Sequence, residues 1–145
     1  MKMAVDRKYI GYRLPPFTVV VEAERLRLFA EAIGARPAAE EAIFAPPTYL
    51  KVIEGEGNSS RELLAALGVD LKQVMHAEQE FEYCEPVKPG DRLTVERVVA
   101  DIYDRKEGLL EFIVVDSMIR HASGALAGRS KQSILVRNKD RTARA

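Results

Sequence analysis

The 145-residue chain contains one cysteine, Cys84, and no tryptophan. A single cysteine excludes an internal disulfide, and we expect Cys84 to act as an ordinary small side chain. Lysine and arginine total 22, as do aspartate and glutamate, so no excess charge points to nucleic acid or an anionic membrane surface. No apolar run reaches membrane-spanning length, and the N-terminus lacks a signal peptide's hydrophobic core. We therefore expect a cytoplasmic protein with no nucleic-acid or membrane partner and no metal.

The apolar content is sufficient for one domain with a real core, because 47% of the residues are hydrophobic and 145 residues is an ordinary domain length. We predict one domain over residues 1–137. The charged segment 138–145 is predicted to be a flexible tail.

The first third of the chain changes from a strand pattern to a helix pattern. Residues 17–22 are dense in β-branched side chains, which favours a first strand. Apolar residues then recur at helical spacing over residues 23–33, and Gly34 follows as a helix stop. We expect this amphipathic helix to pack on a sheet.

Residues 44–55 predict a short central helix. Pro46 and Pro47 can open a helix but cannot continue one, so the helix should begin near Pro47. An apolar surface suitable for burial follows, while Lys51 and Glu54 are the candidates for a solvated edge. The apolar surface consists of Tyr49, Leu50, Val52 and Ile53, and the predicted stops are Gly55 and Gly57.

A second short helix and four strands are predicted for the remainder. Asn58 or Ser59 can cap a helix that runs to Leu67. Alternation then predicts strands over residues 73–83, 92–103, 109–120 and 125–136, joined by turns. In the first of these strands, one face should carry Met75, Ala77, Phe81 and Tyr83, and the other His76, Glu78, Glu80 and Glu82.

Four segments together resemble MaoC-like hydratases and dehydratases, in particular the N-terminal, fungal fatty-acid-synthase-like dehydratase branch. They are residues 29–34, 45–48, 76–83 and 86–91. The resemblance implies an α+β hotdog fold, in which an antiparallel sheet wraps around a central helix. It also implies an acyl-CoA or acyl-carrier-protein thioester as ligand, no cofactor, and a homodimer or a heterodimer with a catalytic hotdog subunit.

The chain departs from this family's catalytic pattern in the loop before the central helix. Active members carry a motif of the form Asp-x-x-Pro-x-His there, because adding water to a conjugated thioester requires a base and an acid. Here Ala35 stands at the aspartate position, and no histidine follows Pro37. The loop also looks shortened. The resemblance therefore implies a degenerate partner subunit without the usual proton-transfer groups.

Three residues remain weak catalytic candidates. His76 is a possible acid or base, but it shares the polar strand face and is more simply a surface or interface residue. Glu40 could replace the missing base, although a carboxylate near a helix start also complements the helix dipole. Glu54 occupies a position where some hotdog thioesterases carry a carboxylate, but a glutamate beside a glycine stop is usually solvated.

Substrate-binding candidates come from the central helix and two strands. Because prolines cannot donate, Thr48 and Tyr49 are the backbone donors expected at the helix start. An acyl tunnel is expected to be lined by Tyr49, Val52, Ile53, Phe81 and Tyr83, whose simpler interpretation is plain core. Arg129 and Lys131 could meet a phosphate or could merely keep the strand soluble. Asp116, if buried, would need a partner such as Arg97 or Arg129.

Three functions remain open at this point. The favoured one is a non-catalytic acyl-thioester-binding subunit or paralogue of an enoyl-thioester hydratase. The second is an active (R)-specific enoyl-CoA hydratase or 3-hydroxyacyl-thioester dehydratase with atypical residues such as His76 or Glu40. The third is an acyl-CoA thioesterase that uses Glu54.

Overall fold

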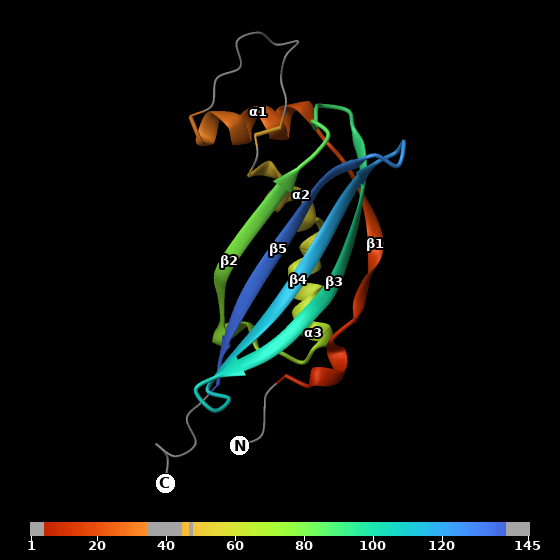
Figure 1. Cartoon of the computed structure of the whole chain (residues 1–145). Coiled ribbons are helices and arrows are strands. Elements are labelled where there is room, and N and C mark those ends of the chain that lie inside the picture. Colours follow the sequence, from red (N-terminus) through yellow and green to blue (C-terminus); the bar gives the residue numbers. More distant parts are fainter. Residues whose placement is uncertain (1–4, 35–44, 47, 139–145) are drawn as a thin grey trace.

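The computed structural model describes residues 5–34, 45–46 and 48–138. Five antiparallel strands form one sheet in the order β1-β3-β4-β5-β2 (Figure 1). Short turns join β3 to β4 and β4 to β5, whereas β2 reaches the far side of β5 from the helical segment. The strands are β1 (Arg13–Val20), β2 (Val74–Tyr83), β3 (Arg92–Arg105), β4 (Leu110–His121) and β5 (Leu126–Arg137).

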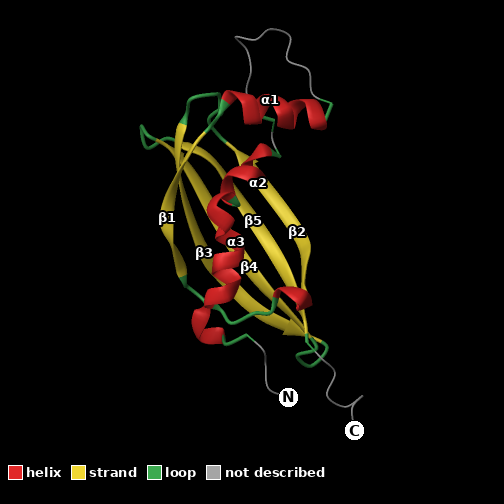
Figure 2. Ribbon diagram, turned by 180° about the vertical axis from the view of Figure 1, so that it is seen from behind, coloured by secondary structure: helices red, strands yellow, loops and turns green. Residues whose placement is uncertain are grey.

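The helices α2 and α3 lie along one face of the sheet, and α1 crosses one end of it (Figure 2). Gly57 and Asn58 both adopt positive φ, at 65° and 58°, and this left-handed pair separates α2 from α3. The helical elements are α1 (Ala23–Ala32), α2 (Tyr49–Glu54) and α3 (Ser59–Ala66), with 3₁₀ turns at Arg7–Tyr9, Glu56–Asn58 and Leu71–Gln73. The predicted order of elements and the sheet wrapped around a central helix are confirmed.

The first strand is longer than its composition predicts, because β1 starts at Arg13 rather than at residue 17. Its pairing with β3 shifts register between Leu14 and Phe17, which is where Pro15 and Pro16 lie. Both prolines are exposed. Proline lacks an amide donor, so it is tolerated at an edge strand or a bulge and not inside a sheet.

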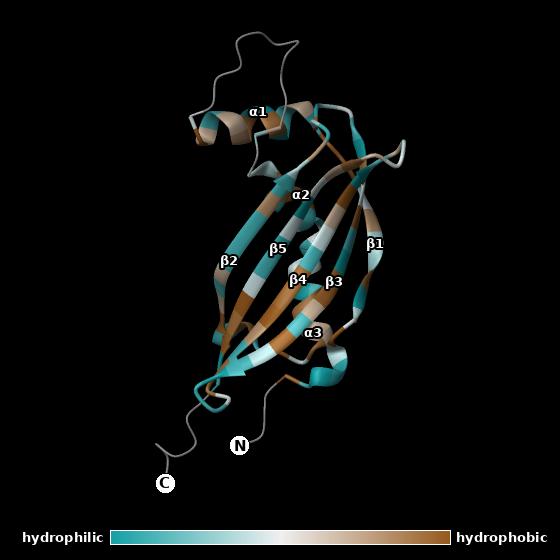
Figure 3. Ribbon diagram, in the orientation of Figure 1, coloured by the Kyte–Doolittle hydropathy of each residue, from teal (hydrophilic) through white to brown (hydrophobic). Residues whose placement is uncertain are grey.

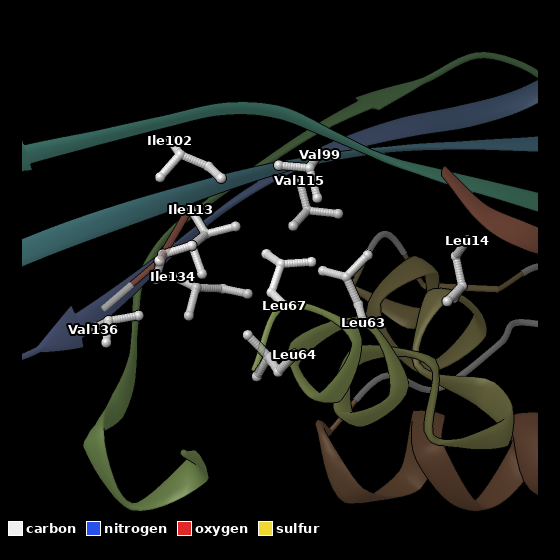
Figure 4. Packing of buried hydrophobic residues seen from close by; sticks show 11 residues of the cluster. Leu14, Leu63, Leu64, Leu67, Val99, Ile102, Ile113, Val115, Ile134 and Val136 are labelled. Atoms are coloured by element: carbon white, nitrogen blue, oxygen red, sulfur yellow. The ribbon is translucent and has the colours of Figure 1, made fainter. Parts of the chain in front are cut away.

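The buried apolar residues that the structure describes form two clusters, one under α2 and one under α3. The cluster under α3 is drawn in Figure 4, where Leu63, Leu64 and Leu67 point toward strand residues. The other cluster lies under α2 and includes Tyr49, Leu50 and Ile53. Leu63, Leu64 and Leu67 were predicted to face inward, and all three are buried.

The alternation predicted for β2 is interrupted. Its pairing with β5 shifts register between His76 and Glu78, and a β-bulge of this kind reverses which face the following side chains occupy. Met75 was predicted to share a face with Phe81, but it is 61% exposed, while Phe81 packs on the α2 cluster. The prediction for Met75 is therefore wrong. Figure 3 shows that most of β2 is hydrophilic.

Candidate functional site

The carboxylate of Glu54, at the end of α2, is completely buried. The prediction that Glu54 lies at a solvated edge is therefore wrong. Its Oε2 atom accepts a hydrogen bond from the Ser130 hydroxyl, and its Oε1 atom accepts one from Gln79 Nε2 at 3.3 Å. The Lys51 ammonium lies 3.5 Å from Oε1. Because buried carboxylates require such partners, the position of Glu54 is explained by contacts distant in sequence.

Arg97 of β3 is the second buried charge, with 1% of its surface exposed. Its guanidinium donates to serine hydroxyls, to an amide oxygen and to the backbone oxygen of Glu54. The contacts are Nε to Ser117 (2.9 Å), Nη1 to Ser59 (3.0 Å), Ser60 (2.8 Å) and the Glu54 oxygen (3.4 Å), and Nη2 to Gln132 Oε1 (2.8 Å). We call these residues, with Glu54 and Ser130, the polar belt. The polar belt contains the last residue of α2 and the first two residues of α3. It therefore lies between the apolar cluster under α2 and the apolar cluster under α3.

Burial sets the electrostatics of the polar belt. Loss of solvent lowers the pKa of Arg97 below its ordinary value, and attraction from Glu54 opposes the effect. A guanidinium nevertheless stays charged in proteins. Arg97 and Glu54 therefore belong to one buried hydrogen-bond network, joined through the Glu54 backbone oxygen. The Glu54 carboxylate is enclosed rather than presented to a ligand.

The start of α2 borders a small hollow of about 190 Å³. Leu50 and Tyr83 line it, together with Ala127 of β5. Of the two amides expected as donors here, that of Tyr49 is engaged, because it donates to the Pro46 oxygen at 2.9 Å. The prediction that the Tyr49 amide is a donor for a ligand is therefore wrong.

The residues predicted to line an acyl tunnel divide into core and edge. Tyr49 and Ile53 are buried, with 4% and 1% exposure, and Val52 is partly buried against the same cluster. Phe81 and Tyr83 lie at the β2 edge and stack with ring centroids 5.8 Å apart. Tyr83 is 49% exposed, so the rings extend from the α2 core to the open edge of the sheet.

Arg129 and Lys131 lie on the opposite face of the sheet from α2. Ser130 between them points inward to Glu54, and side chains alternate along a strand. Both cations line a hollow of about 470 Å³ with Asp116. Asp116 is half-buried and lies opposite Lys131 in the β4–β5 ladder. The suggested Arg97 partner for Asp116 is wrong, because Arg97 points into the polar belt.

Neither histidine lies at the start of α2. His76 is exposed near the other end of β2, and its Nε2 lies 3.0 Å from the Glu78 oxygen. His121 ends β4, with its Nδ1 3.7 Å from Asp91 Oδ2. Glu40 lies outside the described residues. The sequence contains no aspartate between Asp6 and Asp70, so the chain has no aspartate and no histidine immediately before its central helix.

A family comparison agrees with this fold. The family model described as the FAS1-like, dehydratase domain region matches residues 8–127. The chain belongs to this FAS1-like dehydratase family. Its similarity to MaoC-like proteins, predicted from four short segments, is confirmed.

Relatives of this FAS1-like chain support the same assignment. A UPF0336 protein from Saccharopolyspora erythraea is 31% identical over 147 residues, covering 93% of each chain. The crystal structure of a C-terminally truncated HadBC (3R-hydroxyacyl-ACP dehydratase) complex from Mycobacterium tuberculosis superposes with a TM-score of 0.74 at 19% identity, covering 88% of this chain and 96% of that one. The MaoC-like dehydratase of Rhodospirillum rubrum gives a TM-score of 0.66 at 24% identity, covering 90% and 94%. The hotdog fold is thereby confirmed.

Within the part of this FAS1-like chain that the structure describes, no cluster of three metal-ligating side chains occurs. Among the same residues, no helix is long and apolar enough to cross a membrane. The polar belt was missed from the sequence, although one signal was available. Arg97 continues the inward alternation of Val95 and Val99 in β3, which marks it as a charge inside the core.

Proposed function

We propose that the chain binds an acyl thioester of coenzyme A or acyl carrier protein as a non-catalytic hotdog subunit. One observation carries the proposal: a dehydratase-family fold whose central helix is preceded by neither aspartate nor histidine. Hydration of an enoyl thioester needs proton-transfer groups within hydrogen-bond reach of one water. His76 and His121 lie on other parts of the sheet, which supports binding without turnover.

The hollow at the α2 start supports the ligand-binding part of the proposal. Tyr83, Leu50 and Val87 give it an apolar lining, and apolar linings with few polar groups suit acyl chains. It lies at the open β2 edge, where a second hotdog chain, either another copy or a catalytic subunit, would complete the wall. The partner would supply the missing acid and base.

Glu54 gives little support to the thioesterase alternative. Its carboxylate has no exposed surface and already accepts bonds from Ser130 and Gln79. A thioester carbonyl would have to displace these partners before it could be attacked.

The test is a hydration assay with crotonyl-CoA. Hydration is measured as the loss of absorbance of the conjugated enoyl thioester. The chain alone should show no turnover, whereas the chain co-purified with a second hotdog protein that carries the Asp-x-x-Pro-x-His motif should show turnover. Release of free thiol from a saturated acyl-CoA would instead favour a thioesterase. Turnover by the chain alone that His76→Ala abolishes would overturn the proposal.

Ligand binding is tested separately by equilibrium dialysis with butyryl-CoA, using the assembled pair. Tyr83→Ala removes a wall of the hollow and should weaken binding several-fold. Met75→Ala is the matched control, because Met75 is also an exposed apolar residue of β2 but lies near its other end. Equal losses in both variants would contradict a site at the α2 start.

A further inference from the structure

The β2 strand is an open edge of the sheet. It pairs with β5 on one side, and no other strand among the described residues lies on its other side. From Glu78 to Tyr83 its register with β5 is uninterrupted, and this stretch contains no proline. Its outer backbone groups are therefore suited to pairing with another strand.

Three glutamates occupy every outward position of this stretch. Glu78, Glu80 and Glu82 are exposed, whereas the alternate residues Gln79 and Phe81 point inward, to Glu54 and to the α2 cluster. The β2 edge therefore presents a single sign of charge on its outward face.

On the outward face of the sheet, the sign of the charge alternates from β2 to β5 to β4. Glu80 lies opposite Lys131 of β5, which in turn lies opposite Asp116 of β4. Glu82 lies opposite Arg129. Opposite charges in directly opposed cross-strand pairs are stabilising, and like charges are destabilising. Continuing the alternation by one more strand requires cations beyond β2.

A second copy of the chain cannot supply those cations. When two copies pair antiparallel about a two-fold axis perpendicular to the sheet, outward residues must oppose outward residues. Centring the axis on Glu80 places Glu80 against its own copy and Glu78 against Glu82. Moving the register by two residues either way still leaves glutamate facing glutamate.

We propose that β2 is a docking edge for a different chain, whose edge strand carries lysine or arginine at alternate outward positions, and that its glutamates disfavour self-pairing. This inference rests on the sheet-edge pairing in the proposed function and specifies the partner's chemistry.

The chain itself provides a basic-edge probe. The triple variant Glu78→Lys/Glu80→Lys/Glu82→Lys reverses the edge, and analytical ultracentrifugation can compare it, the wild type, and their equimolar mixture. The mixture should form a 1:1 dimer at least ten-fold more tightly than either protein self-associates. Added salt should reduce the difference, because exposed charges are screened.

A neutral variant keeps the test decisive if the lysine variant does not fold. Glu78→Gln/Glu80→Gln/Glu82→Gln removes the repulsion and should raise self-association at least ten-fold. The matched control Glu31→Lys/Glu62→Lys/Glu107→Lys changes the same charge at exposed positions outside β2, and it should not associate with the wild type.

Two outcomes would overturn the inference: a wild-type dimer that the glutamine variant leaves unchanged, or a mixture no tighter than its parents. Either result leaves the proposed function standing if the chain still lacks turnover with crotonyl-CoA. Conversely, turnover by the chain alone removes the proposed function without changing the charge result.

Discussion

A Cβ atom at Gly128 of β5 would lie 2.7 Å from the Cδ1 atom of Leu50 and 2.9 Å from the backbone oxygen of Glu82. The absence of a side chain at this one position lets α2 approach the sheet beside the β2 edge. The position of α2, and of the hollow at its start, therefore depends on Gly128.

Gly128→Ala should destabilise the protein by about 1–3 kcal/mol, the usual cost of overpacking a core. Urea unfolding followed by circular dichroism measures the change. Leu50→Ala in the same chain should not restore full stability, because the contact with the Glu82 backbone remains. Gly55→Ala is the control, since its added Cβ would meet nothing closer than 3.4 Å; an equal loss there would contradict the packing argument.

Arg97→Met should destabilise the protein by about 1–3 kcal/mol, because it leaves the buried oxygens of Ser117 and Gln132 without their donor. The double variant Arg97→Met/Glu54→Gln should lose less than the sum of the single changes, since the two charges lie in one network. Urea unfolding of all three variants measures this coupling. Strict additivity would contradict an interaction between them, and the exposed Glu62→Gln change should remain within about 0.5 kcal/mol.

Glu111→Gln should loosen the N-terminal segment. The buried Glu111 carboxylate accepts bonds from Arg7 Nη1 at 2.6 Å, from Asn138 Nδ2 at 2.6 Å and from the Val5 amide at 3.3 Å. Hydrogen bonds to charged groups contribute about 1.5–3 kcal/mol, and a loss in this range is expected in urea unfolding, with faster amide exchange at Val5. Asp104→Asn, which alters the partly exposed Arg7 pair, should cost less than about 1 kcal/mol.

Alkaline pH should destabilise the fold through Tyr49. Burial raises the pKa of this phenol above its ordinary value of 10.0. Above pH 10 the unfolded chain loses the proton while the folded chain retains it, so stability falls until the folded pKa is passed, by at most about 1.4 kcal/mol per pH unit. Tyr49→Phe should flatten this part of the profile, measured by urea unfolding between pH 8 and 12. An unchanged profile would exclude this phenol as the cause.

The sequence predicted the helices and strands well because residues close in sequence determine where these elements begin and end. Gly34 and the glycines after α2 follow helix ends, and the periodicity of Leu63, Leu64 and Leu67 reports a buried helix face. These features depend on backbone conformation and spacing, which neighbouring residues determine.

The errors arise where distant residues decide the outcome. Glu54 looks solvated on its helix, yet it is buried because Ser130 and Gln79 reach it from two strands. Met75 was placed on the wrong face because one bulge in β2 shifts the alternation. A periodicity argument uses only the residues near each position. It therefore detects neither the distant partners of Glu54 nor the bulge in β2.

The two edge strands of the sheet, β1 and β2, differ in whether another strand can pair with them. At β1, Pro15 and Pro16 remove two backbone donors and break the register, so this margin resists joining another molecule. At β2 no such obstacle interrupts residues 78–83. Molecules that join through β2 therefore have no second equivalent place from which to extend, and they produce a finite particle rather than an open-ended fibril.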